Sequence, residues 1–389
     1  MQVHRPTMHS RAASSAGARG LAISRTCMAL AIALGAVAPA LAAPNQFTVT
    51  NLVTDDPTVN PALITDPSLV NAWGMSHSGA SPIWVSDNGT GVATLYAVNP
   101  STNIPVKQGL TVTIPGDGSV TGQVFAGSVA GNFNADTFLF VSEDGTVSGW
   151  RGALGTAAET LKPGSTANSY KGATLASIGG SSYLYAANFL TGHVDVIKGN
   201  AGAPNLTGAF VDSSLPAGFA PFNIENLGGR LYVTYAEQGS GHDEVDGPGL
   251  GFVDVFDLQG NLIGRVATQG TLNAPWGMEI APASFQAFAG DLLVGNFGDG
   301  MISAFNLGTD AFVGQLLGID GVPIVIDGLW GLLAGNGGSG GSTQAIYFSA
   351  GPGGESHGLF GVLRVPEPAT LTLLGIGLAG AGFARRRKS

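Results

Sequence analysis

The sequence predicts an all-β protein built as a six-bladed β-propeller, and three observations support this fold. Glycine accounts for 61 of the 389 residues, about twice the usual share, whereas charged residues make up only 11%. Short apolar runs alternate with turns rich in Gly, Asn and Asp, which is typical of β-strands. Residues 69–365 divide into six similar units of about 50 residues each. A repeat of this length with several strands per unit indicates a propeller, because one unit cannot bury both faces of its sheet alone.

The first 42 residues are predicted to be a secretory signal peptide. An acid-free start that contains Arg is followed by an apolar run at residues 27–37, which is short for a membrane span. Residues 40–42 read Ala-Leu-Ala, so we expect signal peptidase to cut after Ala42. An uncleaved anchor helix is the alternative. Cys27 is the only cysteine of the chain, and it leaves with the signal, so no disulfide is expected in the mature protein.

The propeller is predicted to occupy residues 43–365. Its first strand, residues 47–53, has no unit of its own, and we expect it to pair with the last blade at residues 359–365 and so to cover a sheet edge. Each unit is expected to contribute a four-stranded blade. The second strands share an apolar pattern and are expected at residues 83–87, 139–143, 184–188, 231–235, 292–296 and 346–350. A long barrel or a double sandwich is the alternative, but neither explains six similar units.

Residues 366–389 are predicted to be a sorting segment with a short apolar helix. A Pro-rich break is followed by the apolar run 369–384 and by the cationic run 385–388. This order of features resembles the PEP-CTERM sorting signal of Gram-negative bacteria, with Pro366, Glu367 and Pro368 as its motif. The resemblance implies export to the periplasm, the outer surface or the medium, with the tail held transiently in the inner membrane and processed by exosortase. A simple tail anchor is the alternative.

The distribution of charge argues against nucleic-acid binding. Eight of the 16 Lys and Arg residues lie in the first 25 or the last five positions, while 25 of the 26 acids lie in residues 43–366. The body therefore has 25 acidic against 8 basic side chains, a net charge of −17. Such a body repels phosphate backbones and is suited to cations or neutral sugars.

Three stretches of the body resemble a family of uncharacterised secreted bacterial β-propeller proteins. The stretches are residues 66–91, 142–150 and 273–300, and the likeness extends over about residues 46–363. It implies the propeller fold but no established activity, so it transfers no catalytic residues. The architecture is similar to NHL-repeat and lactonase-type propellers, which is a similarity of fold only.

One face of the predicted ring gathers polar and aromatic residues. Because successive strands are antiparallel, the start of each first strand and the end of each second strand lie on this face. The strand starts supply Asn71, Trp73, Asn223, Trp276 and Trp330, and the strand ends supply Asp87, Glu143, Asn188, Tyr235 and Asn296. Their oxygens are suitable ligands for Ca²⁺, and the Trp rings are suitable platforms for a sugar. The alternative is that the Trp residues pack between blades and that the acidic motifs form turns.

Two function classes follow from this sequence. The first is an exported binding or structural component of the cell envelope or extracellular matrix, with exopolysaccharide or another envelope protein as its partner. The second is a Ca²⁺-dependent hydrolase of the lactonase or esterase type, in which a bound ion polarises the substrate carbonyl. The residues alone do not decide between them.

Overall fold

The computed structural model describes residues 45–240 and 243–366. These residues form β-strands joined by turns, with short 3-10 helices η1 (Phe133–Ala135), η2 (Gly152–Leu154) and η3 (Ala283–Phe288). The predicted signal peptide with its cleavage at Ala42 lies outside the described residues, as do Glu367, Pro368 and the rest of the sorting segment. No helix in the described part is long and apolar enough to cross a membrane.

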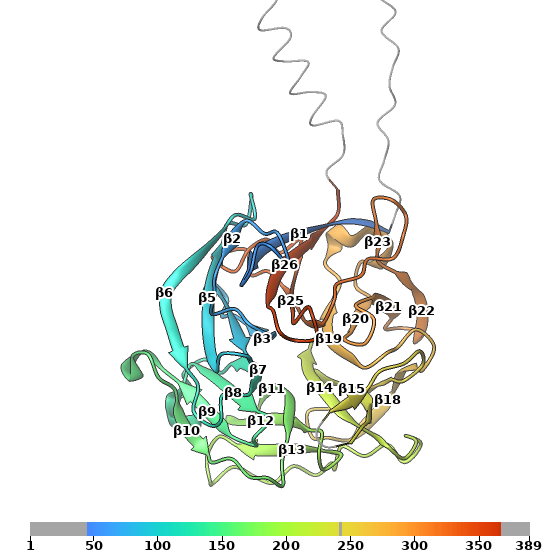
Figure 1. The fold of residues 1–389 in the computed structure, drawn as a ribbon. Helices are drawn as coiled ribbons and strands as arrows, with labels where there is room; N and C mark the ends of the chain where they lie inside the picture. The colour runs from blue at the N-terminus through green and yellow to red at the C-terminus, as the bar shows by residue number, and fades with distance from the viewer. Residues whose placement is uncertain (1–44, 241–242, 367–389) are drawn as a thin grey trace, which may run out of the picture. The chain divides into compact units, whose positions relative to one another are not determined.

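Six sheets are arranged around a central axis, which confirms the predicted six-bladed propeller (Figure 1). Blade 1 contains β3 (Ala72–Ser76), β4 (Ile83–Asp87), β5 (Val92–Val98) and β6 (Pro105–Thr113). Blade 2 contains β7 (Val120–Phe125), β8 (Phe138–Ser142), β9 (Val147–Trp150) and β10 (Glu159–Lys162). Blade 3 contains β11 (Tyr170–Ile178), β12 (Ser181–Asn188) and β13 (His193–Lys198).

The second half of the chain repeats this arrangement. Blade 4 contains β14 (Phe219–Leu227), β15 (Arg230–Gln238), β17 (Phe252–Phe256) and β18 (Leu262–Thr268), and β16 (Glu244–Val245) pairs with β15. Blade 5 contains β19 (Pro275–Ile280), β20 (Leu292–Asn296), β21 (Ile302–Asn306) and β22 (Ala311–Gln315). Blade 6 contains β24 (Leu329–Ala334), β25 (Ile346–Ala350) and β26 (Leu359–Arg364), followed by β1 (Gln46–Thr54) and β2 (Ile64–Thr65).

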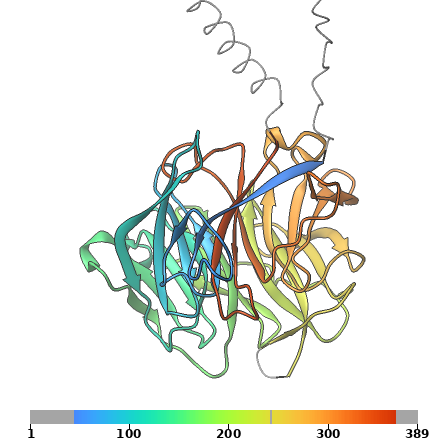
Figure 2. The ribbon, with the colours of Figure 1, turned by 45° about the horizontal axis from the view of Figure 1, so that its top comes forward.

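The first strand of the propeller closes the ring, as predicted. β1 pairs antiparallel with β26, from Thr48 opposite Arg364 to Thr54 opposite Leu359 (Figure 2). It also pairs with β23 (Leu317–Gly318), which connects blades 5 and 6. The last blade therefore combines both ends of the described chain, and this removes an open sheet edge.

The third blade differs from the prediction because it has three strands instead of four. Residues 199–218, where the fourth strand was expected, form turns and irregular backbone. This stretch contains Pro204 and Pro216 together with four glycines. Proline donates no backbone hydrogen bond and glycine weakens a strand, so the composition explains the missing strand.

The inner strands of neighbouring blades approach each other closely around the axis. Every inner strand has a register shift near its start, and in five of them a glycine lies at the shift: Gly74, Gly122, Gly172, Gly277 and Gly331. A Cβ on Gly122 would lie 2.6 Å from the Ala173 nitrogen, and one on Gly277 would lie 2.5 Å from the Trp330 oxygen. Glycine at these positions thus allows the backbone of one blade to pack directly on the next.

Candidate functional site

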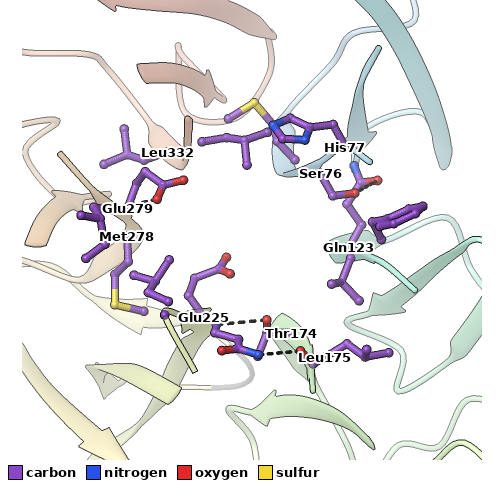
Figure 3. Close-up of a pocket in the computed structure, with 17 residues that line it drawn as sticks. Ser76, His77, Gln123, Thr174, Leu175, Glu225, Met278, Glu279 and Leu332 are labelled. Atoms are coloured by element: carbon purple, nitrogen blue, oxygen red, sulfur yellow. Dashed lines mark hydrogen bonds between the residues drawn. The ribbon is translucent and has the colours of Figure 1, made fainter. Parts of the chain in front are cut away.

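The two faces of the ring carry different residues of the inner strands. We call the face where β3, β7, β11, β14, β19 and β24 begin the strand-start face, and the face where they end the strand-end face. A hollow of about 470 Å³ opens on the strand-end face, and residues from all six inner strands line it (Figure 3). We call this hollow the central funnel. A concave site with convergent polar groups is the default candidate for ligand binding.

Hydrogen bonds between blades fix the wall of the central funnel. Ser76 on β3 donates to Gln123 Oε1 on β7 at 3.2 Å, and Gln123 Nε2 donates to the Gly74 carbonyl at 2.8 Å. Between blades 3 and 4, Asn226 Nδ2 donates to the Leu175 carbonyl at 3.0 Å, and the Asn226 backbone N–H donates to Thr174 Oγ1 at 3.1 Å. The wall is therefore preorganised by contacts that span blades 1 and 2 and blades 3 and 4.

Two carboxyl groups point into the central funnel from neighbouring inner strands, Glu225 from β14 and Glu279 from β19 (Figure 3). Glu279 is held by the backbone, because Oε1 accepts from the Ile280 N–H and Oε2 from the Ala334 N–H, both at 2.8 Å. Burial raises the pKa of both groups. The pKa of Glu225 is raised well above its ordinary value, because the charge of Glu279 adds to the effect of burial.

His77 follows the last residue of β3 and lines the central funnel on the side away from Glu225 (Figure 3). Its Nε2 lies 2.8 Å from the Ala334 carbonyl oxygen, and its Nδ1 lies 2.9 Å from the Ser78 carbonyl oxygen. Both partners are carbonyl oxygens, which accept hydrogen bonds. The nearby imidazole lowers the pKa of Glu279 and so opposes the effect of burial. Glu279 is therefore the member of the pair that is better suited to carry the negative charge, and Glu225 the member suited to hold a proton.

This arrangement predicts how stability depends on pH. The folded chain binds a proton on Glu225 over a pH range in which the unfolded chain has released it. The free energy of unfolding therefore falls as the pH rises through that range and levels off above the folded pKa. We expect Glu225→Gln to be more stable than the natural chain at pH 8 but not at pH 4, as measured by urea unfolding. Glu237→Gln, on β15 outside the funnel, removes the same charge and is the control; an equal effect of both variants would contradict the interpretation.

The predicted tryptophans lie on the strand-start side, where they pack on one another. Trp73 and Trp330 stack with ring centroids 3.6 Å apart, and Trp276 meets Trp73 edge-on at 6.2 Å. All three are buried, together with Phe189 and Phe222. Asn223 donates to the Trp276 carbonyl at 2.9 Å and so joins blade 4 to blade 5. These residues lie where packing between blades was expected as the alternative.

Two of the predicted oxygen ligands join one polar network above these rings. Asn71 donates to Glu355 Oε2 at 2.6 Å and accepts from the Trp330 N–H at 3.1 Å. Its amide also donates to Asn88, which in turn donates to Glu143 at 3.2 Å. Glu143 pairs with the ammonium of Lys171, whose side chain is only 2% exposed. The same ammonium lies 5.3 Å from the centre of the Trp73 ring, so it is held by a carboxylate and an aromatic face.

The remaining predicted ligands serve the blades in which they lie. Asn188 accepts from the Ser169 N–H at 3.1 Å, and Asn296 donates to the Thr271 carbonyl at 2.7 Å, so both hold connections between strands. Asp87 is buried beside Thr94, and burial raises its pKa well above the ordinary value. Tyr235 is buried beside Asp254 in the core between blades 3 and 4.

Across residues 45–240 and 243–366, no three His, Cys, Asp or Glu side chains form a group that could hold a metal ion. The Ca²⁺ site on this face stays a prediction.

The C-terminal segment is confirmed as a sorting signal. Residues 364–388 match the model of the PEP-CTERM protein-sorting motif, and this range includes Pro366, Glu367 and Pro368. The motif implies export, anchoring through the C-terminal segment and processing by exosortase.

Solved structures with similar folds include two enzymes. The chain is 9% identical to a streptogramin B lyase, covering 82% of this chain and 97% of that one at a TM-score of 0.43. It is 15% identical to the periplasmic gluconolactonase of Pseudomonas aeruginosa, covering 76% of this chain and 86% of that one at a TM-score of 0.44. At these values we infer nothing about activity from either structure.

Two proteins of Acanthamoeba polyphaga mimivirus are more similar in sequence. Uncharacterized protein L690 is 31% identical over 322 residues, which cover 77% of this chain and 81% of that protein. Uncharacterized protein R648 is 30% identical over 295 residues, which cover 70% of each. The chain therefore belongs to the family that includes the mimivirus proteins L690 and R648.

Proposed function

We propose that this protein is an exported binding component of the bacterial envelope or extracellular matrix, and that its central funnel binds a neutral, hydroxyl-rich ligand such as a saccharide unit. The observation that carries the proposal is the lining of the funnel. Hydroxyl, amide and carboxyl groups from inner strands converge there: Ser76, Gln123, Thr174, Glu225, Asn226 and Glu279. Sugar hydroxyls both donate and accept, so they are suited to a wall that offers both kinds of partner.

The charge of the protein supports a neutral ligand over an anionic one. The propeller has a net charge of −17, and the funnel itself contains two carboxyl groups. An anionic ligand would meet like charge in partly desolvated surroundings, which is unfavourable. A neutral saccharide avoids this cost. The sorting signal supports the same location, because a protein anchored through its C-terminal segment is presented to envelope and matrix polymers.

Calorimetric titration tests the proposal. Oligosaccharides from the exopolysaccharide of the host are titrated into the natural protein, Glu279→Gln and Glu237→Gln. We expect Glu279→Gln to weaken binding by about tenfold or more, because a hydrogen bond to a charged group contributes about 1.5–3 kcal/mol. Glu237→Gln lies outside the funnel and is expected to bind normally. Equal affinities in all three proteins, or no saccharide binding, would reject the proposal.

The paired carboxyl groups favour a second candidate function, hydrolysis of an ester, lactone or glycosidic bond. A group that holds its proton and a neighbouring group that carries charge are the two partners that acid–base hydrolysis requires. In this alternative, Glu225 gives its proton to the leaving oxygen while Glu279 accepts a proton from the attacking water. Turnover of an aryl ester, lactone or aryl glycoside that is lost in Glu225→Gln would support it.

The Ca²⁺-dependent hydrolase predicted from the sequence, with its site on the strand-start face, has a separate test. The Tm is measured with EDTA and with millimolar Ca²⁺ for the natural protein, Glu143→Gln and Asp87→Asn. We expect Ca²⁺ to raise the Tm by less than about 2 °C, because Lys171 already balances the charge of Glu143. A rise of several degrees that both substitutions abolish would place the ion on the strand-start face. That result would favour metal-dependent hydrolysis over binding alone.

A further inference from the structure

Three strongly exposed apolar side chains lie together on the connection between blades 5 and 6. Ile319, Val322 and Val325 are 68%, 57% and 60% exposed. We call these three residues the exit-edge patch. Single exposed apolar residues are common on the surfaces of soluble proteins, but a group of them at one place marks an interaction surface.

The connection that carries the exit-edge patch is well ordered. The Gly318 N–H donates to the Val322 carbonyl at 2.8 Å, and the Val322 N–H donates to Asp320 Oδ1 at 3.1 Å. On either side of Val325, Ile324 and Ile326 are buried in the same apolar cluster as Phe47. The outward direction of the patch is therefore set by the inward packing of its neighbours.

The exit-edge patch lies where the chain leaves the propeller. The Leu317 N–H donates to the Asn45 carbonyl at 3.1 Å, and Gln46 Nε2 donates to the Ile319 carbonyl at 3.4 Å. β1 runs between β23 and β26, with Gln46 opposite Leu317 and Thr48 opposite Arg364 (Figures 1 and 2). Val365 packs against the buried cluster that contains Ile324 and Ile326.

The length of the chain that follows limits how far this edge can lie from a membrane. The sorting motif begins at residue 364, and the apolar run begins at residue 369. Five peptide units separate these positions, and an extended chain spans at most about 3.6 Å per residue, or about 18 Å in all. When the apolar run lies in a bilayer, the edge at Arg364 is therefore close to the lipid surface.

We propose that the exit-edge patch contacts the lipid bilayer while the C-terminal segment anchors the protein. The apolar side chains of the patch enter the boundary between headgroups and acyl chains, and the C-terminal anchor holds the patch close to this boundary. Asp320 and Asp327 are exposed on the same connection, and their charge keeps the contact shallow and favours zwitterionic over anionic headgroups. The contact orients the propeller with blade 6 toward the membrane and blade 3, which is opposite in the ring, away from it.

Depth-dependent fluorescence quenching tests this contact on the full chain. Cys27 is replaced by Ser, a single Cys is introduced at Val322 or at Val211, and an NBD dye is attached. Val211 is the matched control, because it is a valine of similar exposure, 59%, on the connection between blades 3 and 4. Both proteins are reconstituted in phosphatidylcholine vesicles that contain lipids spin-labelled near the headgroup.

We expect the dye at position 322 to show a blue-shifted emission and at least twofold stronger quenching by the labelled lipid than the dye at position 211. Equal quenching at both positions would overturn the proposal. A blue shift at position 322 that depends on protein concentration and not on the labelled lipid would also overturn it, because it would show a second copy of the chain on the patch. A second variant, Ile319→Ser with Val325→Thr, is expected to reduce the quenching at position 322 while leaving the Tm within about 2 °C.

Discussion

Deletion of residues 46–54 is expected to abolish cooperative unfolding of the propeller. The deleted strand β1 contributes the outer part of blade 6, where it pairs with β26, β23 and β2. Phe47, Leu52 and Val53 are completely buried in two apolar clusters. Each such side chain contributes about 1.5–3 kcal/mol through burial, so the three together approach the whole stability of a typical domain, about 5–15 kcal/mol.

The measurement is thermal and urea unfolding followed by circular dichroism, together with size-exclusion chromatography to detect aggregation through the exposed edge of β26. Two substitutions in β1 show whether the loss of stability comes from the buried side chains that close the ring or from any change in this strand. Phe47→Ala should cost about 3–5 kcal/mol, since it empties a buried site, whereas Val49→Ala should be nearly neutral, because Val49 is exposed. A truncated protein that melts as cooperatively as the natural one would show that β1 is not needed to close the ring.

The fold could be predicted because the evidence for it is repeated six times. Each unit contains an apolar strand followed by a turn, and the extra strand at residues 47–53 has one free edge to cover, that of the last blade. Blade 3 shows where repetition misleads. Its first three strands follow the pattern, but Pro204 and Pro216 interrupt the region of the fourth, and local composition decides the outcome there.

The central funnel was not predicted, for a physical reason. Sequence reasoning followed the polar residues at the ends of second strands, such as Asn188 and Asn296, and the structure uses these amides to hold connections. The bulge in each inner strand also changes which side chains face the axis, so simple alternation fails there. One signal was present: Glu225 and Glu279 are acids at the ends of apolar inner strands in two consecutive blades. An acid in such a position needs an explanation, and the funnel provides it.

Trp330→Ala is expected to destabilise the propeller by about 3–5 kcal/mol, which is the usual cost of emptying a large buried site. Trp330 is completely buried and stacks on Trp73 at 3.6 Å and on Phe297 at 4.1 Å. Its N–H also donates to Asn71, so the substitution removes one partner of the polar network that includes Glu143 and Lys171. Trp330→Phe keeps an aromatic ring in the site and loses this hydrogen bond, and it should cost less, about 1–2 kcal/mol.

Urea unfolding followed by far-ultraviolet circular dichroism measures these costs without relying on tryptophan fluorescence, which the substitutions change. Trp150→Ala is the matched control, because Trp150 is a partly exposed tryptophan on the outer part of blade 2. It should cost less than half as much as Trp330→Ala. Equal costs would mean that the aromatic cluster at the axis is not a principal source of stability. Trp330 is the second residue of β24, and Leu332 further along the same strand lines the funnel. Trp330→Phe keeps β24 in place, so this variant should bind the funnel ligand with unchanged affinity. That outcome would separate the packing at the strand-start face from binding at the strand-end face.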